Sequence, residues 1–147
     1  MITCTKRIEF DYGHRVVGHS GKCANLHGHR GIVEVTCIAD ELDDLGMVID
    51  FGTIKEKIAR WINENWDHNL ILSYDDPMLS ELGIDSLRKL HGRDCFVMAS
   101  NPTAEEMARY LLSVAQALLP NVRVLKVRMW ETPNSYAEAI SDGIQSE

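Results

Sequence analysis

The chain has 147 residues, of which 45% are apolar and 25% are charged, and its formal net charge at neutral pH is -7. This length fits a single domain over residues 1–147, and the composition is typical of a folded soluble protein. The acidic balance argues against a broad nucleic-acid-binding surface, and no apolar run approaches the ~20 residues of a membrane span. Because the charged N-terminus is unlike a signal peptide, we expect a cytoplasmic protein with free cysteines.

Two strands are predicted in the first part of the chain, over residues 3–10 and 32–39. The first stretch alternates imperfectly between polar and apolar residues, and the second is rich in β-branched residues. The glycines between them favour a long antiparallel hairpin. His27 and His29, two positions apart on the second arm, would then point to the same face.

Apolar residues at helical spacing predict a helix over residues 54–65, with Asp50 as its N-cap. The following stretch, residues 73–95, carries several turn signals and reads as an irregular excursion of the same domain, with a short helix ending near Leu90.

The last part of the chain predicts a strand over residues 95–99, a helix within residues 102–119 and a strand over residues 122–131. Thr103 and Glu106 form a capping box at the start of this helix. The order of elements predicts an α+β fold, in which both helices pack on one face of an antiparallel sheet.

Three histidines cluster once the hairpin is drawn: His14 on the first arm, and His27 and His29 on the second. Three imidazoles from adjacent strands can hold one Zn²⁺ and leave the fourth tetrahedral position open, as in catalytic zinc sites. The alternative is that they are ordinary histidines on a polar sheet face.

Cys23 lies four positions before His27 and leaves two hypotheses open. As a fourth ligand it would close the site and make the zinc structural. As an unbound thiol beside the metal, it would be a base or nucleophile poised near neutral pH.

Two further carboxylates are candidates whose sequence signals are weak by themselves. Asp67 precedes His68 after the first predicted helix and could fix the tautomer of that imidazole, although solvated Asp-His pairs are common. Glu131 ends the last predicted strand, where its carboxylate could accept two parallel N–H donors of a planar ligand or simply be exposed to solvent.

Several short motifs occur together in one order, and such a set is far more specific than any one of them. They are FDYGHRV, CANLHGHR, GMVIDFGTIK, WDHNLI, NPTAEEMARYL and VRMWETPNSYAEA. In these motifs the chain resembles the 6-pyruvoyl-tetrahydropterin synthase / 6-carboxytetrahydropterin synthase family. The resemblance covers most of the chain apart from about residues 73–95.

The resemblance implies a zinc site and a proton relay. His14, His27 and His29 would be the zinc ligands, one ion per subunit. Cys23 would be the base that takes a proton from the substrate side chain, and His68 would be its acid/base partner.

It also implies the residues that support this relay and bind the pterin ring. Asp67 would support His68. Glu131 would anchor the ring through its aminopyrimidine edge and belongs with the catalytic relay, while Thr103 and Glu105 would line the ring pocket.

The implied fold is the tunnelling fold, a four-stranded antiparallel sheet with two helices on one face. Three sheets join into a barrel, and two such trimers stack into a homohexamer with the active sites between subunits. This association would cover the open edges of the sheet.

The implied activity is that of a zinc-dependent lyase acting on 7,8-dihydroneopterin triphosphate. The resemblance favours 6-carboxytetrahydropterin synthase, which releases acetaldehyde and triphosphate in the pathway to 7-deazaguanine nucleosides such as queuosine. The alternative is 6-pyruvoyl-tetrahydropterin synthase, which eliminates triphosphate from the same substrate. A hypothesis of another class is a zinc-stabilised binding or assembly module.

The sequence departs from the family pattern near the metal motif. Arg30 follows the second histidine where the family more often has a polar or aromatic residue, and Tyr12 and Gly13 replace a commoner pair of alanines. The ligand set is untouched, so these departures bear on the substrate.

Overall fold

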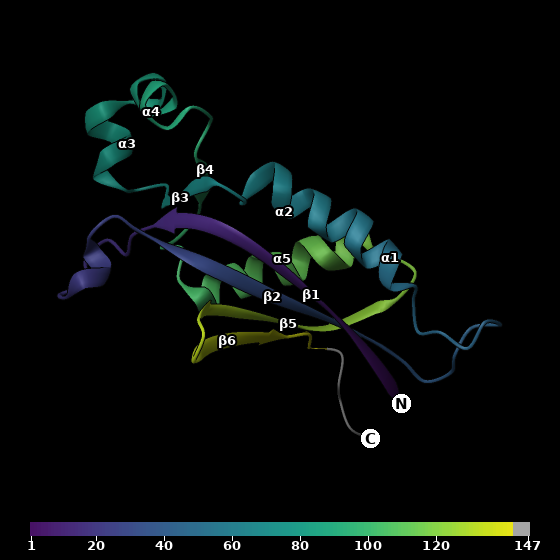
Figure 1. Cartoon of the computed structure of the whole chain (residues 1–147). Helices are drawn as coiled ribbons and strands as arrows, with labels where there is room; N and C mark the ends of the chain where they lie inside the picture. Colours follow the sequence, from purple (N-terminus) through teal and green to yellow (C-terminus); the bar gives the residue numbers. More distant parts are fainter. Residues whose placement is uncertain (143–147) are drawn as a thin grey trace.

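A single mixed sheet forms the centre of the computed structural model, which describes residues 1–142 (Figure 1). The strand order across the sheet is β4-β3-β1-β2-β5-β6. The strands are β1 (Ile2–His14), β2 (His27–Ala39), β3 (Asn69–Ser73), β4 (Phe96–Met98), β5 (Arg123–Thr132) and β6 (Ser135–Ile140).

β1 and β2 form the predicted antiparallel hairpin, but both strands are longer than the sequence pattern indicated. Their register pairs Ile2 with Ala39 at one end and His14 with His27 at the other. The strands therefore continue through the histidine motif, which lies on regular β-structure. The loop between them holds only a short 3-10 turn, η1 (Lys22–Ala24).

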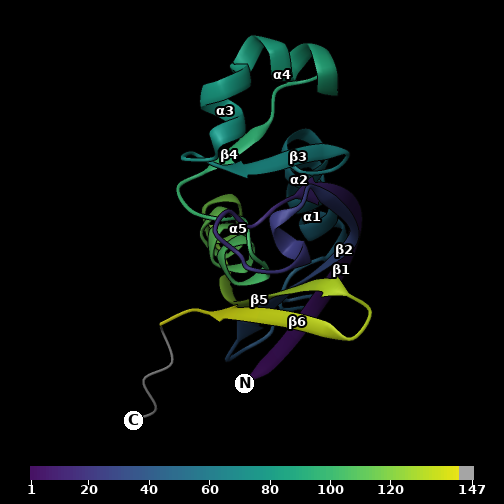
Figure 2. The ribbon, with the colours of Figure 1, turned by 90° about the vertical axis from the view of Figure 1, so that its left-hand side faces the viewer.

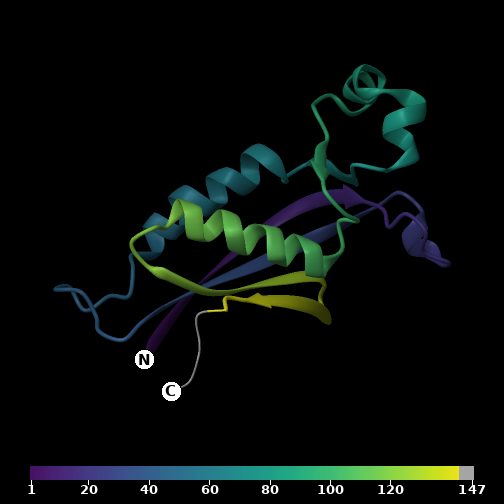
Figure 3. The same cartoon turned by 180° about the vertical axis from the view of Figure 1, so that it is seen from behind.

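The two predicted helices are confirmed, and both cover the same face of the sheet (Figure 3). The first begins after Asp50, whose carboxylate accepts the Gly52 N–H at 2.7 Å. The second begins after Thr103, whose hydroxyl oxygen accepts the Glu106 N–H at 3.2 Å. The first consists of α1 (Phe51–Ile54), the π-helical turn η2 (Lys55–Ala59) and α2 (Arg60–Asn65), and the second is α5 (Ala104–Leu118).

The hydrophobic core lies between these helices and the sheet. Phe10, Val33 and Val127 point into it from three adjacent strands, and Ile58 and Leu111 come from the two helices. Each fully buried side chain of this kind contributes about 1.5–3 kcal/mol by leaving water. The core thereby fixes the helix-covered face of β1 and β2, on which the histidines lie.

Residues 73–95 form a helix pair on the β3/β4 side of the molecule, away from β5 and β6 (Figure 2). The two helices are α3 (Pro77–Leu82) and α4 (Ile84–His91). Leu70 and Leu72 of β3 form a small separate core with Leu87, whereas Ile71 points into the main core. Alternation along β3 therefore buries both faces of this strand.

The expectation of a four-stranded antiparallel sheet is wrong in number and direction, since the sheet has six strands and is mixed. β1, β2, β5 and β6 form an antiparallel part, but β3 pairs in parallel with β1 and β4 in parallel with β3. β3 is a short apolar run that periodicity cannot distinguish from a buried loop or helix end.

Within the described residues, no helix has the length and apolar character to cross a membrane.

Candidate metal centre

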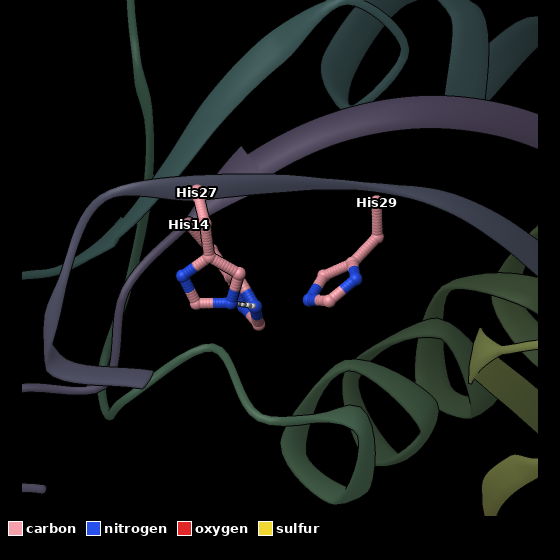
Figure 4. A group of neighbouring side chains, drawn as sticks. All are labelled: His14, His27 and His29. Carbon is pink, nitrogen blue, oxygen red and sulfur yellow. Dashed lines mark hydrogen bonds between the residues drawn. The ribbon is translucent and has the colours of Figure 1, made fainter. Parts of the chain in front are cut away.

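The hairpin register brings three imidazoles together on the helix-covered face (Figure 4). His14 lies opposite His27, and Tyr12 lies opposite His29 on the neighbouring strand. The Nε2 atoms of His14 and His27 are 3.1 Å apart, and the ligand nitrogens of the three histidines lie within 4.8 Å of one another. The predicted convergence of these side chains is confirmed.

Backbone carbonyls fix the tautomers of two of the imidazoles. Nδ1–H of His14 donates to Pro102 O at 2.7 Å, and Nδ1–H of His27 donates to Asn25 O at 2.6 Å. Because a carbonyl oxygen only accepts, the proton is on Nδ1 and the lone pair is on Nε2. Burial also lowers the pKa of His14 and of His29, so these rings stay neutral near pH 7.

This donor set fits a divalent cation. Two neutral Nε2 lone pairs 3.1 Å apart repel each other unless a cation or a proton lies between them. Nε2 of His29 is buried and has no hydrogen-bond partner among residues 1–142. Three imidazoles, two of them held through the other ring nitrogen by a backbone carbonyl, are the ligand type that Zn²⁺ takes in catalytic sites.

Glu131 completes the polar lining of this centre from β5. Its Oε1 lies 3.4 Å from Nε2 of His14 and 3.7 Å from Nε2 of His29, and its side chain is 29% exposed. The carboxylate therefore lies at the boundary between the histidine cluster and solvent.

Four of the predicted residues, Cys23, Thr103, Glu105 and Glu131, line one pocket of about 360 Å³, which we call the Cys23 pocket. They come from the β1–β2 loop, the start of α5 and the end of β5. Although distant in sequence, they are brought together in the fold, and Glu131 joins this pocket to the histidine cluster.

Cys23 is half-buried on η1 and is not part of the histidine cluster. Its carbonyl accepts the Val16 N–H at 2.8 Å. The neighbouring Val17 is held twice by Asn101, which accepts the Val17 N–H at 3.0 Å and donates to Val17 O at 2.9 Å. Sequence reasoning missed Asn101 because the contact joins residues 84 positions apart.

Asp67 and His68 form a dyad between α2 and β3. Asp67 Oδ2 lies 3.0 Å from Nδ1 of His68, and Asp67 Oδ1 accepts the Asp11 N–H at 3.0 Å. Although burial opposes it, the hydrogen bonds from Asp11 and His68 lower the pKa of Asp67. His68 adopts a φ of 53°, uncommon for a non-glycine residue, and its N–H donates to Asp11 O at 2.7 Å.

The dyad and Cys23 are not brought together within one chain. His68 lies 3.9 Å from the carboxylate of Asp11, and Asp11 alternates with His14 along β1, so the two side chains point to opposite faces of the sheet. His68 lines a separate groove of about 750 Å³ walled by α3 and α4. Arg30, an unusual residue of the metal motif, lies on the same outer face and pairs with Asp11 at 3.0 Å.

The family model described as 6-pyruvoyl tetrahydropterin synthase matches residues 3–141. The chain belongs to this family. The resemblance inferred from the motifs is confirmed, and the tetrahydropterin synthase family to which the chain belongs is a family of enzymes.

Two curated relatives from different bacteria carry the same name. The chain is 45% identical to 6-carboxy-5,6,7,8-tetrahydropterin synthase of Rickettsia felis over 94% of this chain and 99% of the relative. It is 34% identical to the enzyme of the same name from Aquifex aeolicus, over 91% and 94% of the two chains.

Two solved structures share the fold of the synthase family. An uncharacterized protein from Wolinella succinogenes superposes with a TM-score of 0.81 at 27% identity, covering 96% of this chain and 98% of that one. A 6-pyruvoyl tetrahydropterin synthase from Caenorhabditis elegans superposes with a TM-score of 0.67 at 21% identity, over 96% of each chain. The second likeness shows the fold alone.

Proposed function

We propose that this chain is a zinc-dependent 6-carboxy-5,6,7,8-tetrahydropterin synthase. It would convert 7,8-dihydroneopterin triphosphate to 6-carboxytetrahydropterin with release of acetaldehyde and triphosphate. The observation that carries the proposal is the cluster of three imidazoles beside the Cys23 pocket, with Cys23 itself outside the cluster. The curated relatives of that name support the choice of reaction.

His14, His27 and His29 would hold the Zn²⁺ through Nε2. The ion would supply Lewis acidity to a side-chain hydroxyl of the substrate. Cys23, on the wall of the same pocket, would take a proton from the substrate side chain.

Glu131 and the start of α5 would bind the pterin ring. A carboxylate accepts two parallel N–H bonds from an aminopyrimidine edge, and Glu131 lies between the histidine cluster and the pocket. The hydroxyl oxygen of Thr103 already accepts the Glu106 N–H as an N-cap, which leaves its O–H and one lone pair for a ligand. Glu105 lies in the first turn of the same helix, at the pocket wall.

A second copy of the chain would supply the dyad. Because His68 and Cys23 lie on opposite faces of one sheet, a shared proton relay requires His68 and Asp67 of another subunit. The homohexamer with sites between subunits, in which three sheets form a barrel, meets this requirement. It would also cover the open edges β4 and β6.

Product analysis tests the reaction. The purified protein is incubated with zinc and 7,8-dihydroneopterin triphosphate, and the products are identified by mass spectrometry. The proposal predicts a carboxypterin together with acetaldehyde and triphosphate. A pyruvoyl product would favour the alternative 6-pyruvoyl-tetrahydropterin synthase, and the absence of both would overturn the enzyme assignment.

A further inference from the structure

The phenol of Tyr12 is a buried donor without a partner. Its side chain is 3% exposed, and its hydroxyl makes no hydrogen bond within the described residues. A buried hydroxyl without a partner destabilises a fold, and a native fold that retains one requires an explanation. The ring also contacts two of the three imidazoles, with centroids 5.2 Å from His14 and 5.6 Å from His29.

Gly31 makes room for this ring. A Cβ at position 31 would lie 2.8 Å from Cε1 and 3.1 Å from Cδ1 of Tyr12, which real Cβ atoms essentially never do. Tyr12 therefore occupies the space that a side chain on β2 would fill. Any residue other than glycine at this position would displace the ring.

Glu131 lies next to this space on the following strand. The register that pairs Ile32 with Trp130 places Gly31 beside Glu131 on β5. Tyr12 reaches this space from β1 and Glu131 from β5, one on each side of β2, and the phenol can donate where the carboxylate can only accept.

Metal binding would leave the Glu131 carboxylate in need of a donor. In the structure Oε1 faces Nε2 of His14 and of His29, at 3.4 and 3.7 Å. Nε2 of His14 carries a lone pair and cannot donate, and once both nitrogens ligate an ion neither of them can, so the carboxylate must either bind the ion itself or turn to another donor.

We propose that Tyr12 is a positioning residue for Glu131: its phenol donates a hydrogen bond to the carboxylate in the metal-loaded protein and so keeps the fourth coordination position open. The inference rests on the metal centre of the proposed function. It gives a role to a residue that departs from the family pattern, together with the glycine that accommodates it.

The experiment uses the full-length protein loaded with Co²⁺, whose visible absorption reports coordination, and titrates it with thiocyanate as a ligand for the open position. The variants are Tyr12→Phe, Glu131→Gln and the double variant, with Tyr110→Phe as a matched control in the aromatic cluster away from the metal centre.

Tyr12→Phe should lower the affinity for thiocyanate about tenfold, the size of one hydrogen bond to a charged group, because the freed carboxylate competes for the open position. In the Glu131→Gln background the same change should alter the affinity less than about twofold.

Gly31→Ala provides a second variant that keeps the hydroxyl but displaces the ring, and it should lower the affinity in the same way. Tyr12→Phe could lower the thiocyanate affinity equally in the unsubstituted and in the Glu131→Gln background, or could leave it unchanged when Glu131 is present. Either result would overturn the role of Tyr12 while leaving the metal centre intact. Failure of the unsubstituted protein to bind Co²⁺ would overturn the metal centre, and the role of Tyr12 with it.

Discussion

At the residue scale, the proposed metal centre depends on three imidazoles whose ligand nitrogens converge. His27 is presented by β2, and the carbonyl of Asn25 orients its ring so that Nε2 points toward His14. His27→Ala should weaken zinc binding by at least about 100-fold, more than the loss of an outer-shell partner does. Competition with a chromophoric zinc chelator measures the change.

His19 is the matched control for this substitution. It is an exposed imidazole at the rim of the Cys23 pocket, and its ring accepts the Gly21 N–H at 2.8 Å. His19→Ala should leave zinc binding unchanged. If both substitutions weaken zinc equally, the assignment of the ligands is wrong.

The spacing of His27 and His29 on an arm of a hairpin was enough to predict their convergence with His14, because alternation is a local property of strands. The groups that fix these residues could not be predicted. Pro102 O lies 88 positions from His14 in the sequence, and nothing local indicates that the start of α5 would meet the end of β1. The opposite placement of Cys23 and His68 is likewise a result of tertiary packing.

At the element scale, an ion pair joins the end of β1 to the start of α3. Arg15 contacts the buried carboxylate of Asp76 through two nitrogens, and Asp76 Oδ1 accepts the Met78 N–H at 2.8 Å. Burial alone would raise the pKa of Asp76, but the ion pair and the Met78 N–H lower it below its ordinary value.

Asp76→Asn should therefore destabilise the protein by about 3 kcal/mol at pH 7, because it leaves Arg15 without its charged partner. The native pKa is depressed, so this stabilisation is fully present above the unfolded pKa of about 4 and is lost as the pH falls through the native value. Urea unfolding between about pH 7 and pH 3 should show the two proteins converging in acid. If the difference in unfolding free energy between the two proteins is constant over this pH range, the role of the ion pair is contradicted.

The two helices that cover the sheet could be predicted, whereas α3 and two of the six strands could not. α5 has a regular apolar stripe and a capping residue, which together suffice. β3 has five buried residues because two different cores cover it, so its sequence does not alternate. β6 follows β5 through a turn at the chain's C-terminal end, and its sequence SYAEAI is too polar to indicate a strand.

Leu111 tests the packing of α5 on the sheet. It is fully buried, whereas Ser113 on the same helix is exposed. Leu111→Ala should cost about 2–5 kcal/mol of unfolding free energy, and Ser113→Ala less than about 0.5 kcal/mol. If the two substitutions change the free energy of urea unfolding equally, the placement of this helix is contradicted.

At the scale of the whole molecule, the two halves of the proposed relay lie on opposite faces of one sheet. Cys23→Ala and His68→Ala should each abolish turnover. Unfolding and refolding the two variants together should restore it, since randomly mixed subunits would give about a quarter of the sites an intact Cys23 and an intact partner dyad.

The control mixes Cys23→Ala with a variant that carries both substitutions. It should stay inactive, because no site can then receive both groups. If refolding the two single variants together yields no activity, although the unsubstituted protein refolded in the same way is active, the dyad does not act across subunits.

The account depends most on an ion held by three imidazoles with the thiol of Cys23 left unbound. Zinc stoichiometry and turnover of Cys23→Ala test this most directly. The account predicts one zinc per chain, as in the unsubstituted protein, with turnover reduced by at least about 100-fold. Loss of zinc together with loss of the fold would contradict it, because Cys23 would then be a ligand of a closed, structural site.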